Sequence, residues 1–82
     1  MSTWEEHAAC RADGVDPEWF FAATTPDRRR AVRVCTGCPV RAECLRDAME
    51  TEQPGLRFGV RAGLSAYARD RLWRRVQARE AA

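Results

Sequence analysis

The chain has 82 residues, which is enough for one domain, and a domain of this size is hard to stabilise without a metal, disulfides or a partner. Its formal net charge is +2, from 14 basic and 12 acidic residues, so overall charge does not by itself indicate a nucleic-acid partner. No stretch approaches the ~18 apolar residues of a membrane span, and the N-terminus does not resemble a signal peptide. We therefore expect a cytoplasmic protein, and in that compartment thiols stay reduced.

Two short helices are predicted in the N-terminal quarter of the chain. Residues 2–6 have the spacing of a capping box, which predicts a first helix that begins near Trp4 and carries Cys10. Asp16 and Pro17 are residues typical of a helix N-cap and first position, and they predict a brief aromatic helix that follows directly.

The central region is predicted to form two helices joined by a tight turn. Thr25 and Pro26 favour the start of a helix that continues to about Cys35. Gly37 lies in the tight turn that follows, where it is free to adopt a positive φ. Pro39 suits the first position of the next helix, on which one apolar face is formed by Val40, Cys44, Leu45, Ala48 and Met49.

The C-terminal region is predicted to hold a turn and one last helix. Residues 56–63 contain two glycines and indicate a turn or small hairpin. Ser65 can cap a helix that runs to about Arg79, with a buried stripe of Ala68, Leu72 and Val76. No segment shows the sustained alternation of a sheet, so the fold class is all-α: one domain over residues 1–82, with four to five short helices and a glycine-containing turn before the last.

The four cysteines carry the strongest chemical signal, and their spacing is C-x24-C-x2-C-x5-C. A [4Fe–4S] cube needs one thiolate at each of its four irons, and three ligands from one segment with a remote fourth can supply them. Cys35 and Cys38 can reach adjacent corners from one turn, and Cys44 follows on the next helix with its side chain directed back toward that turn. Cys10 would then supply the fourth thiolate from the first helix, so the spacing favours a cluster.

Other sites compete with a cluster on spacing alone. Structural zinc sites usually show two paired knuckles, whereas this chain has one, and His7 is expected to be an ordinary exposed or core histidine. Two disulfides are compatible with the even cysteine count but lack a secretory context. A thiol–disulfide oxidoreductase working through Cys35 and Cys38 would need a βαβ context that is missing. No catalytic constellation is present, so we do not expect an enzyme.

Three runs of sequence are similar to one known family. They are D-P-E-W-F-F at residues 16–21, V-C-T-G-C-P-V-R-A-E-C-L at residues 34–45 and G-V-R-A-G-L-S at residues 59–65. In this order they resemble the WhiB-like family of actinobacterial iron–sulfur transcription regulators. The resemblance extends from Trp4 to about Arg75, which is nearly the whole chain.

The resemblance implies a helical domain wrapped around a [4Fe–4S] cluster, with Cys10, Cys35, Cys38 and Cys44 as its ligands. It implies transcriptional control through contact with the C-terminal domain of an RNA polymerase σ factor, and sensitivity of the cluster to redox change or nitric oxide. The protein would be monomeric on its own. The residues implied to lie at or near the σ-factor surface are Trp4, Phe20, Phe21, Gly59, Val60, Arg61 and Gly63.

Two features of the last third of the chain bear on its partners. The family has a tryptophan and a glycine where this chain has Arg61 and Ala62, so we expect either that Arg61 meets a carboxylate or that the partner differs from the usual σ factor. From residue 56 onward there are seven arginines against two acidic residues. Residues 66–82 would form a basic helix or tail, either simply solvated or in contact with promoter DNA through Arg71, Arg74, Arg75 and Arg79.

Overall fold

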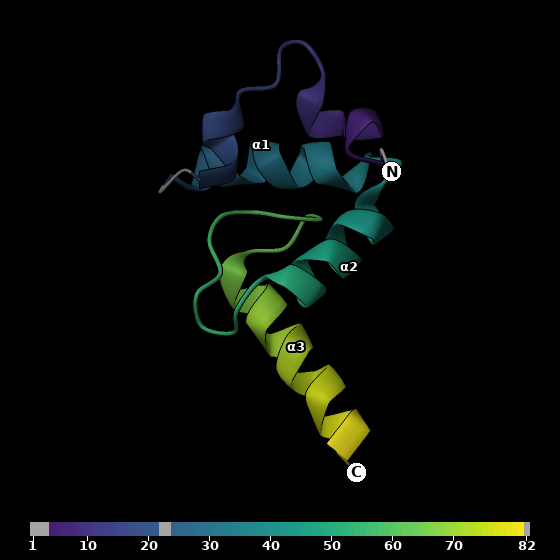
Figure 1. The fold of residues 1–82 in the computed structure, drawn as a ribbon. Coiled ribbons are helices and arrows are strands. Elements are labelled where there is room, and N and C mark those ends of the chain that lie inside the picture. Colours follow the sequence, from purple (N-terminus) through teal and green to yellow (C-terminus); the bar gives the residue numbers. More distant parts are fainter. Residues whose placement is uncertain (1–3, 22–23, 82) are drawn as a thin grey trace.

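A computed structural model of the chain describes residues 4–21 and 24–81 (Figure 1). Within these residues the secondary structure is helical and contains no strand, which confirms the all-α fold class. Three 3-10 segments precede three α-helices: η1 Trp4–His7, η2 Ala9–Arg11, η3 Pro17–Phe21, α1 Thr25–Thr36, α2 Arg41–Thr51 and α3 Ala66–Ala81. None of the helices in the described part of the chain is long and apolar enough to cross a membrane.

The N-terminal segments fold back over α1 (Figure 1), and η2 and η3 both contact it. The predicted cap before η3 is confirmed, because Asp16 Oδ1 accepts a hydrogen bond of 2.9 Å from the Glu18 N–H. The continuous first helix is wrong: Ala8 is extended, with φ −67° and ψ 131°, and separates η1 from η2. The predicted capping residues Ser2 and Thr3 lie outside the described residues.

The core of this half is small and includes one of the thiols. Phe20, Ala31, Cys35 and Val60 form a buried cluster, and half-buried side chains pack against it: Val15, Trp19 and Val34. Since Val60 comes from the loop before α3, the core already joins the two ends of the chain. The Cys35 sulfur therefore lies in largely apolar surroundings.

The junction between α1 and α2 differs from the expected turn. Gly37 has φ −92° and so does not use its freedom to adopt a positive φ. The Cys38 N–H donates to the Cys35 carbonyl at 3.0 Å, which continues the helical path of α1. Pro39 lies two residues before α2 and not at its first position. The predicted apolar face of α2 is confirmed, because Val40 and Ala48 are buried and the other members are half-buried.

The predicted turn before the last helix is present but forms only one isolated bridge, between Arg61 and Leu64. Ala62 and Gly63, between them, have φ of 53° and 77°. Gly59, with φ 67°, lies so close to η3 that a Cβ there would stand 2.7 Å from the Phe20 carbonyl oxygen, which only glycine allows. Together these residues hold the loop against the N-terminal half.

The predicted cap of α3 is confirmed, since Ser65 Oγ accepts a hydrogen bond of 3.1 Å from the Ala68 N–H. The predicted buried stripe is wrong. Val76 is exposed, Ala68 and Leu72 are only half-buried, and the buried residue of α3 is Arg69. The physical reason is that charged groups, and not an apolar stripe, attach α3 to the loop and α2.

We call these groups the arginine network: Glu52, Arg57, Arg69 and Asp70. The Arg69 side chain donates to both Glu52 carboxylate oxygens at 3.0 and 3.1 Å, and to three backbone carbonyls at 2.8 Å each. Arg57 donates to Asp70 at 2.7 Å and to Glu52 at 2.9 Å. Although burial opposes ionisation of Glu52, hydrogen bonds from Arg69 and Arg57 lower its pKa. The network is therefore charged at neutral pH.

Replacing Arg69 with alanine should cost about 3–5 kcal/mol of unfolding free energy, because the Glu52 carboxylate and three carbonyls lose their buried partner. Denaturant unfolding followed by circular dichroism measures this value. The matched control is Arg75→Ala on the exposed face of the same helix, where a change within about 0.5 kcal/mol is expected. Equal effects of the two substitutions would contradict the structural role of the network.

Candidate metal centre

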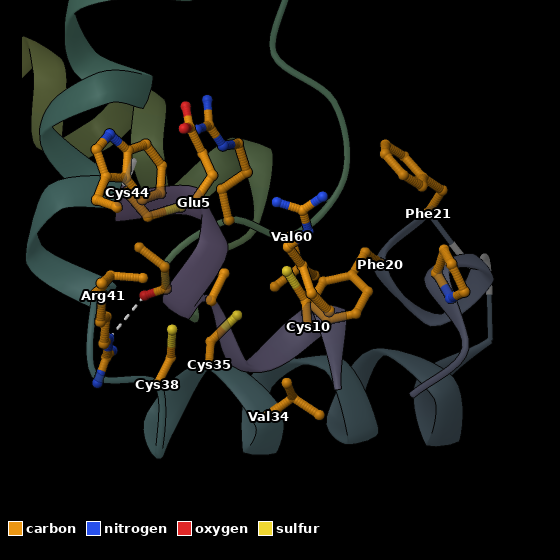
Figure 2. A pocket seen from close by; sticks show the side chains of 17 residues that line it. Glu5, Cys10, Phe20, Phe21, Val34, Cys35, Cys38, Arg41, Cys44 and Val60 are labelled. Carbon is orange, nitrogen blue, oxygen red and sulfur yellow. Dashed lines mark hydrogen bonds between the residues drawn. The ribbon is translucent and has the colours of Figure 1, made fainter. Parts of the chain in front are cut away.

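All four cysteines line one cavity of about 400 Å³, which we call the thiol cavity (Figure 2). Cys10 reaches it from η2, Cys35 from the last turn of α1, Cys38 from the junction and Cys44 from the first turn of α2. Apolar side chains complete much of the wall: Phe20, Val34, Val40, Val60 and Ala62. The chain thus brings thiols from distant positions to one partly apolar space.

The four sulfurs are near enough to influence one another. Burial raises the pKa of the Cys35 thiol, a hydrogen bond from the Gly63 backbone partly offsets this, and the charges of the other three thiolates raise it further. The Ala9 N–H donates to Cys38 Sγ at 3.3 Å. A backbone N–H donor is therefore directed at the Cys38 sulfur.

All four cysteines lie in the described part of the chain and are free thiols. Within residues 4–21 and 24–81, no three histidine, cysteine, aspartate or glutamate side chains gather closely enough to hold a single metal ion. Instead the sulfurs border a volume of about 400 Å³, which is far larger than one ion. Four thiol donors around such a space fit a polynuclear iron–sulfur group, whose corners lie apart and each take one thiolate.

The turn at residues 61–64 closes one side of the thiol cavity. Arg41 Nε donates to the Ala62 carbonyl oxygen at 2.8 Å, the dashed line in Figure 2. At Gly63 a Cβ would stand 3.0 Å from the Arg41 guanidinium, and the positive φ also favours glycine there. The start of α2 and the turn are therefore fixed to each other, which keeps the Gly63 N–H close to Cys35.

Arg61 pairs with carboxylates of its own chain, one on α2 and one just after it. Its Nη2 donates to Asp47 Oδ2 at 2.8 Å, and its Nη1 lies 3.8 Å from a Glu52 oxygen. Arg61 also lines the thiol cavity together with Cys44. Burial opposes the charge of Arg61, yet the hydrogen bond that it donates to Asp47 and the interaction with the Cys44 thiolate raise its pKa.

The residues implied to bind a σ factor come together around this cavity. Trp4, Phe20, Phe21, Val60 and Arg61 all line it, and the two glycines of the set, Gly59 and Gly63, hold the adjoining backbone. The two phenylalanines differ, because Phe20 is buried whereas 71% of Phe21 is exposed. Of the pair, Phe21 is the one that a partner could contact.

Sequence reasoning missed two exposed apolar residues, Leu56 and Phe58, which share a second hollow with Phe21. We call Phe21, Leu56 and Phe58 the apolar patch; they border a separate hollow, and Leu56 and Phe58 are 60% and 72% exposed. Arg57, between the latter two, is buried. The alternation Leu-Arg-Phe at residues 56–58 indicates that the apolar side chains and the arginine point in opposite directions. Such a pattern normally predicts that the apolar side chains are the buried ones.

The remaining predicted residues lie away from the cavity. His7 is exposed and does not line the cavity, as expected for an ordinary histidine. The candidate DNA contacts Arg71, Arg74, Arg75 and Arg79 are exposed on α3. The C-terminal half of that helix projects from the rest of the molecule (Figure 1).

Comparison with known proteins places the chain in one family. Residues 4–72 match the family described as "Transcription factor WhiB". The transcriptional regulator WhiB of Streptomyces coelicolor is 42% identical over 69 residues, which cover 84% of this chain and 74% of that protein. WhiB2 of Mycobacterium tuberculosis is 40% identical over 73 residues, which cover 89% of this chain and 76% of that protein. WhiD of Streptomyces coelicolor is 39% identical over 83 residues, covering 93% and 70%. The chain therefore belongs to the WhiB family of transcriptional regulators.

Proposed function

We propose that this protein is an iron–sulfur transcriptional regulator that binds the C-terminal domain of a σ factor at promoters. In this proposal Cys10, Cys35, Cys38 and Cys44 hold a [4Fe–4S] cluster, and the single domain over residues 1–82 is organised around it. The observation that carries the proposal is the thiol cavity, in which four thiols from distant positions border one space. A bound cluster would supply the sensitivity to oxidants or nitric oxide.

The surroundings of the sulfurs support a cluster. Phe20 and Val60 are buried in the wall of the cavity and keep water from part of it. The Ala9 N–H is directed at the Cys38 sulfur at 3.3 Å, and the Gly63 backbone lowers the pKa of Cys35 against the effect of burial. Hydrogen bonds to sulfur and exclusion of water are the two main means by which proteins tune and protect iron–sulfur groups.

A cluster in this position would also link parts of the chain that otherwise share few contacts. Its ligands would come from η2, the end of α1 and the start of α2. Loss or modification of the cluster would loosen η2 and the turn at residues 61–64 together, since both border the cavity. A chemical signal at the metal would in this way alter the surface formed by those segments.

Protein purified without oxygen should contain about four irons per chain, with matching acid-labile sulfide. Cys38→Ser should lose most of both, because it removes one of the four thiolates. Ala42→Ser, an exposed position on α2, is the matched control and should load like the wild type. Metal, sulfide and visible-absorbance measurements test this. About one zinc per chain without sulfide would reject the cluster and favour a zinc-stabilised module.

The apolar patch is the part of the surface best suited to a protein partner. Phe21 borders both the thiol cavity and the hollow between Leu56 and Phe58, so the patch is continuous with the metal centre. Monomeric proteins seldom expose several large apolar side chains side by side without a binding role. We therefore place the σ-factor contact on this patch, beside the turn residues implied by the family resemblance.

Phe58→Ser should weaken binding to the σ-factor domain by about tenfold to a hundredfold, because exposed aromatic side chains commonly act as interface anchors. The unfolding free energy should change little, since the side chain is already mostly exposed. Val32→Ser on the exposed face of α1 is the control. Titration calorimetry with the cluster-loaded protein measures the affinities, and equal losses for the two variants would remove the patch from the interface.

The basic face of α3 is proposed to contact the DNA backbone. Its exposed arginines carry no evident base-reading arrangement, so the contribution should be electrostatic and independent of DNA sequence. In a complex with the σ-factor domain and promoter DNA, Arg75→Gln should reduce the slope of log K against log salt by about one. Arg29→Gln, exposed on α1, is the control and should leave the slope unchanged. An unchanged slope for Arg75→Gln would contradict the DNA contact and indicate that α3 is simply a solvated helix.

A further inference from the structure

We propose that Arg61 tunes the metal centre and favours the reduced cluster, because its side chain lines the thiol cavity with Cys44 and is held by Asp47, three residues after Cys44 on α2. The inference rests on the proposed function, in which the four cysteines hold the cluster. It goes beyond that function by assigning a role in redox chemistry to a residue of the turn that is not a ligand.

The position of Arg61 is fixed by α2. Its partner Asp47 follows Cys44 by three residues, so the two lie on neighbouring turns of one helix face. The side chain of Arg61 is 28% exposed and lines the cavity together with Cys44. A guanidinium group presents five N–H donors in a rigid fork, so the hydrogen bond to Asp47 leaves others that can face the Cys44 sulfur.

The charge balance favours a net positive influence at that sulfur. Asp47 and Glu52 both oppose the charge of Arg61. Water screens Asp47 more strongly, since 40% of its side chain is exposed against 28% for Arg61. Glu52 lies farther away, at 3.8 Å, and its carboxylate is also paired with Arg57 and Arg69. An iron–sulfur cluster with four thiolate ligands carries net negative charge, and reduction adds to it. A partly buried cation or N–H donor near one sulfur therefore stabilises the reduced form and raises the reduction potential.

Two other arginines, Arg11 and Arg41, border the cavity but are not expected to influence the cluster as strongly. Both are exposed, so solvent screens their charges. Arg41 is in addition hydrogen-bonded to the Ala62 carbonyl oxygen. Arg61 is the half-buried arginine of the three, and the Cys44 thiolate contributes to the raised pKa of its side chain.

The test compares the midpoint potential of the cluster in anaerobically loaded wild-type protein, Arg61→Gln, Arg61→Lys and Arg46→Gln. Redox titration followed by electron paramagnetic resonance measures it. Arg61→Gln should make reduction on the order of tenfold less favourable, a shift of about 59 mV to more negative potential. Arg61→Lys keeps the positive charge but loses the forked set of N–H donors, so its midpoint potential should lie between those of the wild type and Arg61→Gln. Arg46→Gln removes an exposed charge from the same helix and should match the wild type.

The outcomes separate this inference from the proposed function. Wild-type protein without iron and sulfide would refute the proposed function itself. A normal cluster whose potential is the same in wild type and Arg61→Gln, or shifts equally in Arg46→Gln, would overturn only the role of Arg61. If Arg61→Gln holds no cluster, the midpoint potential of Arg61→Lys is compared with that of the wild type. Provided that circular dichroism shows wild-type helix content for Arg61→Lys, a potential equal to or above the wild-type value overturns the inference.

Discussion

The structure depends on the closure of the chain around the thiol cavity. On one side, η2 and η3 pack on α1; on the other, the loop before α3 is joined to α2 and α3 by the arginine network. Val60 links the two sides, since its N–H donates to the Phe20 carbonyl at 2.8 Å and its side chain enters the buried cluster. A chain this short has little apolar material left to fill the space between, and thiols border that space instead.

The arginine network explains why apolar side chains face outward. Arg57 and Arg69 turn inward to Glu52 and Asp70, which fixes the loop so that Leu56 and Phe58 point to solvent. Buried ion pairs repay little of their desolvation cost, so the network contributes more to the choice of one loop conformation than to stability. Its consequence at the surface is a patch whose side chains add little to the core and are available to a partner.

Local chemistry made parts of the fold predictable. The caps at Asp16 and Ser65 depend on short-range hydrogen bonds, and both form as the sequence indicates. Gly37 has no contact that requires a positive φ, and the conformational freedom of glycine is not used there. The burial of Arg69 depends on partners 5 to 17 residues away in the chain, through pairings that no helical periodicity reveals. For the candidate site, the cysteine spacing anticipated the shared cavity, whereas the apolar patch required the structure.

The two departures from the family pattern at the turn have different consequences. Ala62 keeps the left-handed backbone that a glycine would adopt, at a cost of about 1–2 kcal/mol, and Arg41 holds its carbonyl, so the turn keeps its shape. Arg61 instead changes what the turn presents, because its side chain is directed to Asp47 on α2. An aromatic anchor at that position would have served the partner surface. In the proposed function, apolar docking would then rest on Phe21, Leu56 and Phe58, so that the turn would serve the cluster and the patch would serve the partner.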